Sequence, residues 1–483
     1  MGMRTKGTRG ALTRRDMLRY GAAAVGGMAL VACGHPSAST PTSTTASKST
    51  ASPAVHPTVR LVGNFPGVQA GSAAAAEIGK AFTRAYPHIE VDQPNPQTSY
   101  NILTTLIVAG KAPDFFTTSY MIVMSLWYSK AFLDLTPYVN TPEGKALIAD
   151  FPAGLAAGQR IPDGPIPGLA YKACPAGVYY NADMFKSKHV APPAAGYTWD
   201  DYRAMCLQVV DPASHVWGTG GDMYSLSLEA APAWGTEWVP VNNPMVLNYN
   251  PQIVAAETLL QELRYVDNTF MPGHLMNWST SFSNGQMATI RQNSYSLVPY
   301  AQAIGSSFNW GTAPEPAGPA RTASSLATQP WSIVSTTKHP DSCWDVILWG
   351  HSEEFWTLLF NNQGTDIPPQ KSMAALWRSS MLKTYPRLLG HIDLTAWTDP
   401  IMNNTGILQY PFRYANDSAW SPWTDAVGFA LTGNPPNGDK DVATTFEAAS
   451  KLTAKLEQTA QQIAEQLQAS KTTSKTSGGA SNS

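Results

Sequence analysis

Residues 59 to 117 alternate between short apolar runs with strand character and longer amphipathic runs with helical character. The short runs end in turn residues such as Gly and Pro, and the longer runs repeat their apolar side chains every three or four positions. This alternation predicts an α/β fold in which a parallel sheet is covered on both faces by helices. We expect strands at 59–62, 89–91 and 114–117, and helices at 73–86 and 100–109.

Loops at one edge of such a sheet are the expected place for a binding site. In open α/β sheets, ligands bind beyond the carboxyl ends of the strands. The loops 64–68 and 118–121 follow the first and third predicted strands. We therefore expect these two loops to lie on one rim.

The first 33 residues have the order of an export signal: basic residues, a short apolar run, then small residues. The apolar run from Tyr20 to Ala32 would form a helix of about 20 Å, too short for a bilayer core of roughly 30 Å. Leu30–Cys33 resembles a bacterial lipobox, in which the cysteine is acylated and becomes the new N-terminus. Thr13–Leu18, with its paired arginines, resembles a twin-arginine signal. We expect a signal peptide at 1–32 and lipidation at Cys33.

Two low-complexity segments flank the rest of the chain. Residues 33–57 are almost wholly Ser, Thr, Ala and Pro after Cys33, and residues 470–483 are mostly Ser, Thr, Lys and Gly. Neither can bury apolar area, so we expect a flexible tether and a disordered tail. The tether would hold the mature chain on a lipid anchor at the outer face of the cell membrane, facing either a periplasm or the medium.

A long helix is predicted just before the tail. One stripe carries the apolar residues, with Lys, Glu and Gln opposite. We expect this stripe to pack against the folded body, and a coiled-coil seam is the alternative. The stripe consists of Val442, Phe446, Leu452, Leu456, Ile463 and Leu467.

Charge and composition exclude some partners. Removing the six basic residues and one acidic residue of the signal from 32 Lys and Arg and 34 Asp and Glu leaves 26 and 33, a net charge of −7. No cluster of Lys and Arg forms a nucleic-acid footprint. Only 14% of residues are charged, whereas 15 Trp and 19 Tyr are present. A neutral surface rich in aromatic residues suits an uncharged, hydroxylated ligand, although large cores also bury Trp.

The cysteines and histidines predict no metal or cofactor. After lipidation of Cys33, the remaining thiols are Cys174, Cys206 and Cys343. The chain has no CxxC pair and no His cluster at metal spacing. An odd count leaves at least one free thiol. We favour three buried thiols, and the alternative is one disulfide among them.

Known catalytic patterns are also missing, so we expect no enzyme. The sequence has no Gly-x-Ser-x-Gly, no His-Glu-x-x-His and no phosphate-cradling loop. A secreted glycoside hydrolase is the main enzymatic alternative, and it needs two carboxylates across the scissile bond. Glu237, Glu315 and Asp366 are available, but nothing in the sequence pairs them.

Six motifs between about Val59 and Met373 give a family resemblance. In this order, the chain resembles the extracellular solute-binding proteins of bacterial ABC importers, of the maltose-binding, family 1 kind. The motifs are Lys80–Phe82 with Tyr86–Val91, Ala109–Asp114, Leu133–Tyr138, Ile166–Leu169 with Val178–Phe185, Pro192–Pro193 with Thr198–Asp201, and Phe282–Ala288. Thr198 also reads as a helix cap, and Trp199 as a core residue.

The resemblance implies a two-lobed periplasmic-binding-protein fold of type II, with a hinge and a ligand cleft between two α/β lobes. One lobe would comprise 58–173 with about 328–400, and the other 174–327 with about 401–469. The chain would cross between them near Lys172–Pro175 and near Ser325–Gln329. Closure on a ligand would be a hinge motion.

The implied function is a monomeric receptor that captures a carbohydrate outside the cell and delivers it to the permease subunits of an ABC importer, without catalysis. The alternative is a non-sugar solute, such as a polyol or a glycerol phosphodiester. A phosphodiester would require Arg or Lys in the cleft, and Arg291 is the basic residue nearest the proposed rim.

Candidate ligand contacts are aromatic residues in loops near the rim, with two amides beside them. They are Phe65, Tyr120, Trp234, Asn293, Tyr295, Gln329 and Trp331. The family often has Gly-x-Trp after the strand at 287–290, where Asn293 or Tyr295 now stands. Its usual Gly-Gly near the second crossing is replaced by Thr328–Trp331. Both departures leave the identity of the ligand open.

Overall fold

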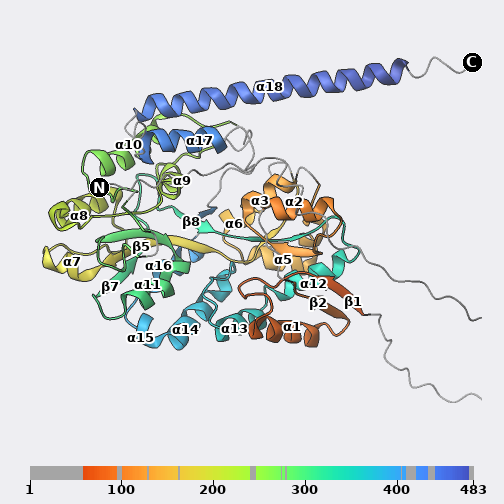
Figure 1. The fold of residues 1–483 in the computed structure, drawn as a ribbon, viewed down its shortest axis with the longest axis horizontal. Coiled ribbons are helices and arrows are strands. Elements are labelled where there is room, and N and C mark those ends of the chain that lie inside the picture. Colours follow the sequence, from red (N-terminus) through yellow and green to blue (C-terminus); the bar gives the residue numbers. More distant parts are fainter. Residues whose placement is uncertain are drawn as a thin grey trace, which may run out of the picture. The chain divides into compact units, whose positions relative to one another are not determined.

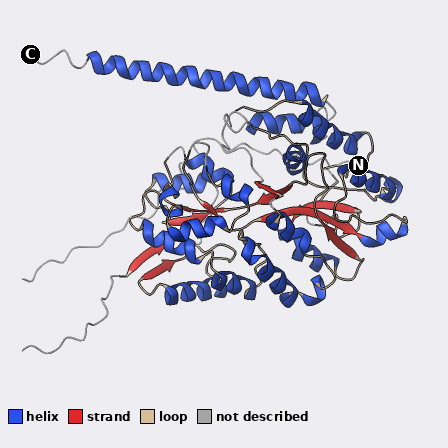
Figure 2. Ribbon diagram, turned by 180° about the vertical axis from the view of Figure 1, so that it is seen from behind, coloured by secondary structure: helices blue, strands red, loops and turns tan. Residues whose placement is uncertain are grey.

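The computed structural model describes residues 58–94, 100–127, 130–160, 164–239, 246–273, 275–277, 280–403, 405–408, 420–432 and 441–477. The predicted signal peptide, lipidation site and tether lie outside these residues. Within the described part, no helix is both long and apolar enough to cross a membrane. The strands lie between layers of helices (Figure 2).

The predicted alternation at the start of the fold is confirmed. Strand β1 (Val59–Val62) pairs in parallel with β2 (Ile89–Asp92), and the Asp114 N–H donates to the Val62 carbonyl at 2.7 Å just before β3 (Phe115–Thr117). Along the chain, α1 (Ala73–Ala85) separates β1 from β2, and α2 (Tyr100–Val108) separates β2 from β3 (Figure 1). The Ser72 hydroxyl caps α1 by accepting from the Ala75 N–H, which fixes where that helix begins.

The alternation in the sequence predicts a parallel sheet, but the strands around β3 are antiparallel. Strand β9 (Pro330–Ile333) lies between β3 and β4 (Leu169–Ala170) and is antiparallel to both. The reason is that β9 returns from a distant part of the chain, so no local pattern sets its direction.

A second sheet is built around β5 (Cys174–Asn181). This strand is antiparallel to β6 (Thr289–Asn293), β7 (Trp310–Ala313) and β8 (Ser324–Ala327), and β10 (Gly406–Leu408) extends the sheet in parallel with β8. Seven of the eight residues of β5 are buried. A strand covered on both faces reads as a continuous apolar run, which is why β5 shows no alternation.

Helices cover both sheets. The helices α3 to α6, α12 and α13 are Tyr120–Trp127, Thr136–Val139, Pro142–Ala149, Ala153–Gly158, Pro340–Trp349 and Glu353–Asn361. The helices α7 to α11 are Ala182–Ser187, Trp199–Val209, Met223–Ala233, Pro251–Tyr265 and Leu297–Ile304. The helices α14 to α18 are Ala374–Thr384, Pro386–Leu389, Thr395–Met402, Trp420–Val427 and Val442–Ser477. Thr198 caps α8 in a capping box with Asp201, and Trp199 is buried, as expected from the sequence.

Helix α16 packs on the second sheet and not on the first. Trp397 of α16 lies against Tyr179 of β5, with ring centroids 4.9 Å apart. A Cβ atom added at Gly177 would meet the Trp397 ring at 2.7 Å, so the close approach requires glycine in β5. The lobe boundary expected near residue 400 does not match this packing, because α16 precedes that boundary and lies on β5. Since α13 contacts α1 of the first region and α16 contacts β5, the chain passes from one region to the other between α13 and α16.

Among the side chains of α18 that the structure describes, those of its first turns pack against the body, while Ile463 and Leu467 of the predicted stripe lie outside the described side chains. Val442, Phe446 and Ala449 are buried, and α18 contacts α17 and α10. Leu452 and Leu456 of the predicted stripe are 47% and 42% exposed. The helix continues to Ser477 (Figure 1), so residues 470–477, expected to be disordered, are helical.

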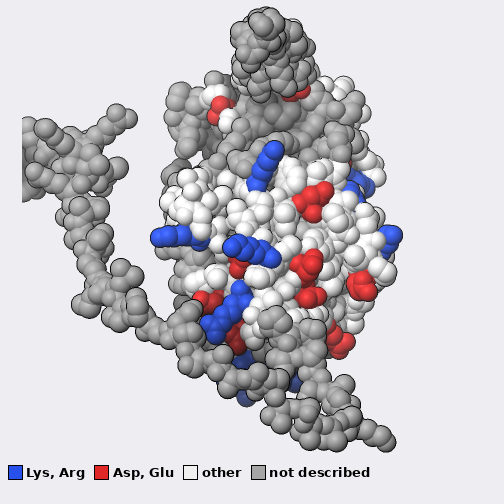
Figure 3. All heavy atoms as spheres, turned by 90° about the vertical axis from the view of Figure 1, so that its right-hand side faces the viewer, with Lys and Arg blue, Asp and Glu red and all other residues white. Residues whose placement is uncertain are grey.

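One face of the molecule illustrates the sparse charge. In Figure 3, basic and acidic side chains are interspersed over a largely uncharged surface. Neither sign forms a continuous patch on the part of this face that the structure describes.

Candidate functional site

Three chain segments meet where β5 begins. Cys174 and Pro175 pair with Ala327 and Leu326 at the end of β8, so the two crossings predicted from the sequence lie side by side. The Ala173 N–H donates to the Ile367 carbonyl at 2.9 Å, so the segment between α13 and α14 also lies beside the start of β5. We call residues 171–175, 325–329 and 364–368 the first, second and third crossings.

A lysine and an aspartate join the first crossing to the third. The Lys172 ammonium lies 3.0 and 3.2 Å from the two carboxylate oxygens of Asp366, and the Tyr171 hydroxyl donates to the same carboxylate at 2.7 Å. The Lys172 and Asp366 side chains are only 14% and 18% exposed. Burial and the nearby Asp366 carboxylate raise the pKa of the Cys174 thiol to about 12, so this cysteine stays protonated.

A small cavity of about 150 Å³ opens beside Asp366. It is lined by Gly67, Trp356, Leu359, Gln363, Gly364, Thr365 and Asp366. Gly67 belongs to the rim loop predicted after β1, and its φ of 78° lies in the left-handed region that favours glycine. The rim loop and the third crossing therefore share a cavity, whose lining residues include a carboxylate, an amide, a hydroxyl and a buried indole.

Of the predicted contacts, Asn293, Tyr295 and Gln329 gather at the crossings. Asn293 is buried and its side-chain amide donates to the Cys174 carbonyl at 2.9 Å. Gln329 accepts from the Tyr171 N–H through its backbone carbonyl at 3.0 Å. Tyr295 is 42% exposed, and its hydroxyl donates to the Gln292 amide oxygen at 3.2 Å.

Phe65 and Trp331 lie in the core instead of at an open rim. Trp331 is a residue of β9, 0% exposed, and it stacks on Phe115 with centroids 5.8 Å apart and an interplanar angle of 15°. The Phe65 ring contacts the Trp331 ring edge to face, with centroids 6.3 Å apart. The expectation that Trp331 lies in an open loop is wrong, because Trp331 is part of a strand and its ring packs against Phe115 and Phe355.

Tyr120 and Trp234 lie apart from the crossings. Tyr120 is buried at the first turn of α3, and its hydroxyl donates to the Gly158 carbonyl. Trp234 follows the last turn of α9, is half-buried and contacts Trp199 at a centroid distance of 6.2 Å. Neither residue is brought to the cavity at Asp366.

Arg291 is buried and neutralised. Its guanidinium pairs with Glu229 and, at 2.6 Å, with Glu315, and it lies over the Trp199 ring at 5.3 Å. Burial raises the pKa of Glu315, although Arg291 opposes this shift. An anionic solute could reach Arg291 only by displacing these carboxylates, a cost that the sequence did not reveal.

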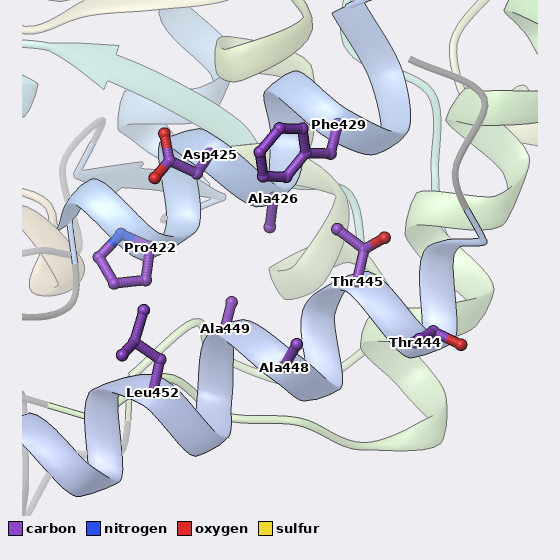
Figure 4. A pocket seen from close by; sticks show the side chains of 9 residues that line it. All are labelled: Pro422, Asp425, Ala426, Phe429, Thr444, Thr445, Ala448, Ala449 and Leu452. Atoms are coloured by element: carbon purple, nitrogen blue, oxygen red, sulfur yellow. The ribbon is translucent and has the colours of Figure 1, made fainter. Parts of the chain in front are cut away.

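A second, larger pocket lies outside the crossings. It measures about 340 Å³ between α17 and the start of α18 (Figure 4). Its wall is mostly apolar, with Asp425 and two threonines as the polar members. The apolar lining residues are Pro422, Ala426, Phe429, Ala448, Ala449 and Leu452. It holds none of the predicted contacts.

The described residues contain no group of three or more His, Cys, Asp or Glu side chains placed to hold a metal ion. Cys174, Cys206 and Cys343 are free and buried, as the sequence favoured. The disulfide that had been left open is therefore not formed among these three.

The bacterial extracellular solute-binding protein family matches residues 66–355, more than half of the chain. The chain belongs to this family. It is an extracellular solute-binding protein of the kind that serves ABC transporters, as the order of its motifs had indicated. A comparison with the curated proteins finds no match.

Solved structures show the two-lobed type II fold. The ABC substrate-binding protein Lmo0181 from Listeria monocytogenes, in complex with cycloalternan, is 17% identical at a TM-score of 0.65, covering 83% of this chain and 99% of that one. The sugar-binding protein MalE from Xanthomonas citri is 16% identical at 0.65, covering 84% and 100%. UgpB from Mycobacterium tuberculosis, in complex with glycerophosphocholine, is 15% identical at 0.63, covering 84% and 100%.

Proposed function

We propose that this solute-binding protein captures a carbohydrate outside the cell and delivers it to the permease subunits of an ABC importer. The observation that carries the proposal is that basic side chains at and beside the crossings are paired with carboxylates. Lys172 is paired with Asp366 and Arg291 with Glu229 and Glu315, while amides and hydroxyls surround them. Such a region offers hydrogen bonds to a neutral hydroxylated solute, because no charge there lacks a partner of opposite sign.

Relatives with similar folds support this choice and supply the alternative. Their structures contain cycloalternan and alpha-D-tagatose, but also glycerophosphocholine. A phosphodiester would need a basic group free to meet its charge. Lys172 at the first crossing and Arg291 in β6 both already face carboxylates, so the sugar is the better fit.

The proposed receptor performs no catalysis. The three carboxylates considered for glycoside hydrolysis each face a different basic residue: Glu237 pairs with Arg321, Glu315 with Arg291, and Asp366 with Lys172. Hydrolysis needs two carboxylates that face one scissile bond. Separate pairing of all three argues for binding alone.

Thermal unfolding with a panel of solutes tests the proposal. A solute that binds only the folded state at 100 times its Kd adds about 2.7 kcal/mol to the unfolding free energy. Cycloalternan, alpha-D-tagatose, maltose and glycerophosphocholine should be compared, with chromatography of the bound sugar to detect turnover. A shift with glycerophosphocholine alone would favour the phosphodiester, and turnover would refute a pure receptor.

We also propose that the mature protein is a monomer anchored by lipid at Cys33, since Leu30–Cys33 precedes a Ser/Thr-rich tether. Cys33→Ala should release the protein or leave it uncleaved, as shown by membrane fractionation and intact mass. A mature-sized Cys33→Ala protein that still partitions with membranes would contradict the anchor.

A further inference from the structure

The first and third crossings are held together by more than backbone pairing. Besides the Ala173–Ile367 hydrogen bond, three side chains converge at Asp366: the Lys172 ammonium, the Tyr171 hydroxyl and, at 3.6 Å, the Cys174 thiol. All three come from the first crossing, whereas Asp366 belongs to the third. The two crossings therefore share one charged contact.

We propose that Lys172 and Asp366 are positioning residues for solute binding: their ion pair clamps the first crossing to the third, so that both turn as one hinge and set how the lobes meet on a solute. This inference rests on the proposed receptor function. It concerns the hinge segments and not the residues that touch the solute.

The burial of the pair separates it from a surface ion pair. Exposed pairs contribute little because water and salt screen them. At 14% and 18% exposure, loss of one partner leaves the other charge poorly solvated. Desolvation lowers the pKa of the Lys172 ammonium, but its neighbours, among them the Asp366 carboxylate, favour the charged form and the net pKa is raised. Lys172 therefore stays charged throughout the physiological range.

The clamp is also connected to both sides of the hinge. Tyr171 stacks on Trp356 of α13, with centroids 6.3 Å apart and an interplanar angle of 16°. On the other side, the Cys174 carbonyl accepts from the Asn293 amide at the end of β6. A shift of Asp366 relative to Lys172 must therefore move contacts on both sides.

The chain offers a matched control in Lys188 and Asp211. This is also a Lys–Asp pair, at 3.6 Å, but it is 43% and 34% exposed and joins the end of α7 to the loop after α8. It lies away from all three crossings. Loss of Lys188 removes the same charge without touching the hinge.

Hydrogen exchange on the full chain tests the clamp without a solute. The variants are Lys172→Met, Asp366→Asn, the double variant, Lys172→Arg and the control Lys188→Met. In the single variants, peptides covering 171–175 and 364–368 should exchange roughly tenfold faster, as expected for a coupled pair. Residues 176–180 of β5 should not change.

The double variant keeps the test valid if a lone buried charge impairs folding, because it removes both charges. Its exchange should be no faster than that of either single variant, and Lys172→Arg should preserve most of the protection. Unchanged exchange at 171–175 and 364–368, effects that simply add, or faster exchange through all of β5 would overturn the proposal.

Titration with cycloalternan and alpha-D-tagatose supplies the functional readout. For a sugar that binds the wild type, the double variant should raise Kd by about three- to tenfold through faster dissociation. Because this variant leaves no lone buried charge, its melting temperature should stay close to that of the wild type, and a merely structural loss would then leave Kd unchanged. Unchanged dissociation would overturn the positioning role. If neither sugar binds the wild type, the carbohydrate proposal fails while the exchange data still decide the clamp.

Discussion

The side-chain amide of Asn293 donates to the backbone carbonyl of Cys174 at 2.9 Å. The same amide lies 3.4 Å from the Ser325 carbonyl, so one side chain joins the first crossing to the second. Asn293 is buried at the end of β6. A residue that the sequence placed among the ligand contacts thus ties together the segments around which the lobes are expected to move.

Replacing Asn293 by Ala should lower the free energy of unfolding by about 1–3 kcal/mol, because buried carbonyls would lose their donor. Asn309 is a suitable comparison, since it is largely exposed and donates to Asp183 at 3.0 Å. Asn309→Ala should cost less than about 1 kcal/mol. Urea denaturation of both variants measures the difference, and equal losses would contradict this role for Asn293.

The sequence predicted features set by local order. The alternation from 59 to 117 predicted β1 to β3 with their helices, because spacing and turn residues determine such elements. The first two crossings followed from the family motifs that flank them. No sequence motif marks the third crossing. It became visible only from contacts between residues far apart in the chain, such as Trp397 with Tyr179.

The aromatic contacts were harder to predict for the same reason. Pro330 beside Trp331 indicated a loop, whereas Trp331 lies in β9 and rings from distant segments bury its indole completely. Local propensity cannot report which distant side chains will pack on a segment. Tyr295, beside the same crossings, stays accessible because it sits in the short turn after β6 and not within a strand.

Trp331→Ala should therefore act on stability. Removing a fully buried indole should lower the unfolding free energy by about 3–5 kcal/mol. Trp234 is half-buried, so Trp234→Ala should cost clearly less. Calorimetry on the two variants compares them. A stable Trp331→Ala protein with weakened sugar affinity would instead restore Trp331 as a ligand contact.

Glu257 should make stability fall as pH rises. Its carboxyl is wholly buried, accepts from the Ser227 hydroxyl at 3.0 Å, and burial raises its pKa from 4.5 to about 8. Between these values the folded state binds more protons than the unfolded state. The unfolding free energy should therefore decrease with pH across this window, by up to about 1.4 kcal/mol per pH unit.

Glu257→Gln removes this titration. The variant should gain stability relative to the wild type as pH rises from 5 to about 8, measured by urea denaturation at several pH values. Glu143, exposed on α5, provides the control, and Glu143→Gln should follow the wild-type profile. Parallel profiles for wild type and Glu257→Gln would show that the buried carboxyl is not the source.

Tyr295 should act on affinity and not on stability. Its ring is 42% exposed beside the crossings, so truncation removes little buried surface. By analogy with aromatic pairs, we expect an aromatic face that stacks on a sugar to contribute about 0.5–1.5 kcal/mol, which corresponds to a two- to twelvefold change in Kd. Tyr295→Ala should weaken binding of the best sugar in the panel by that factor while the melting temperature stays within about 2 °C.

Tyr249, which is 38% exposed just before α10, supplies the matched control. Calorimetric titration that finds equal affinities for the two variants would remove Tyr295 from the binding surface, because both changes delete the same exposed ring and only one lies at the crossings.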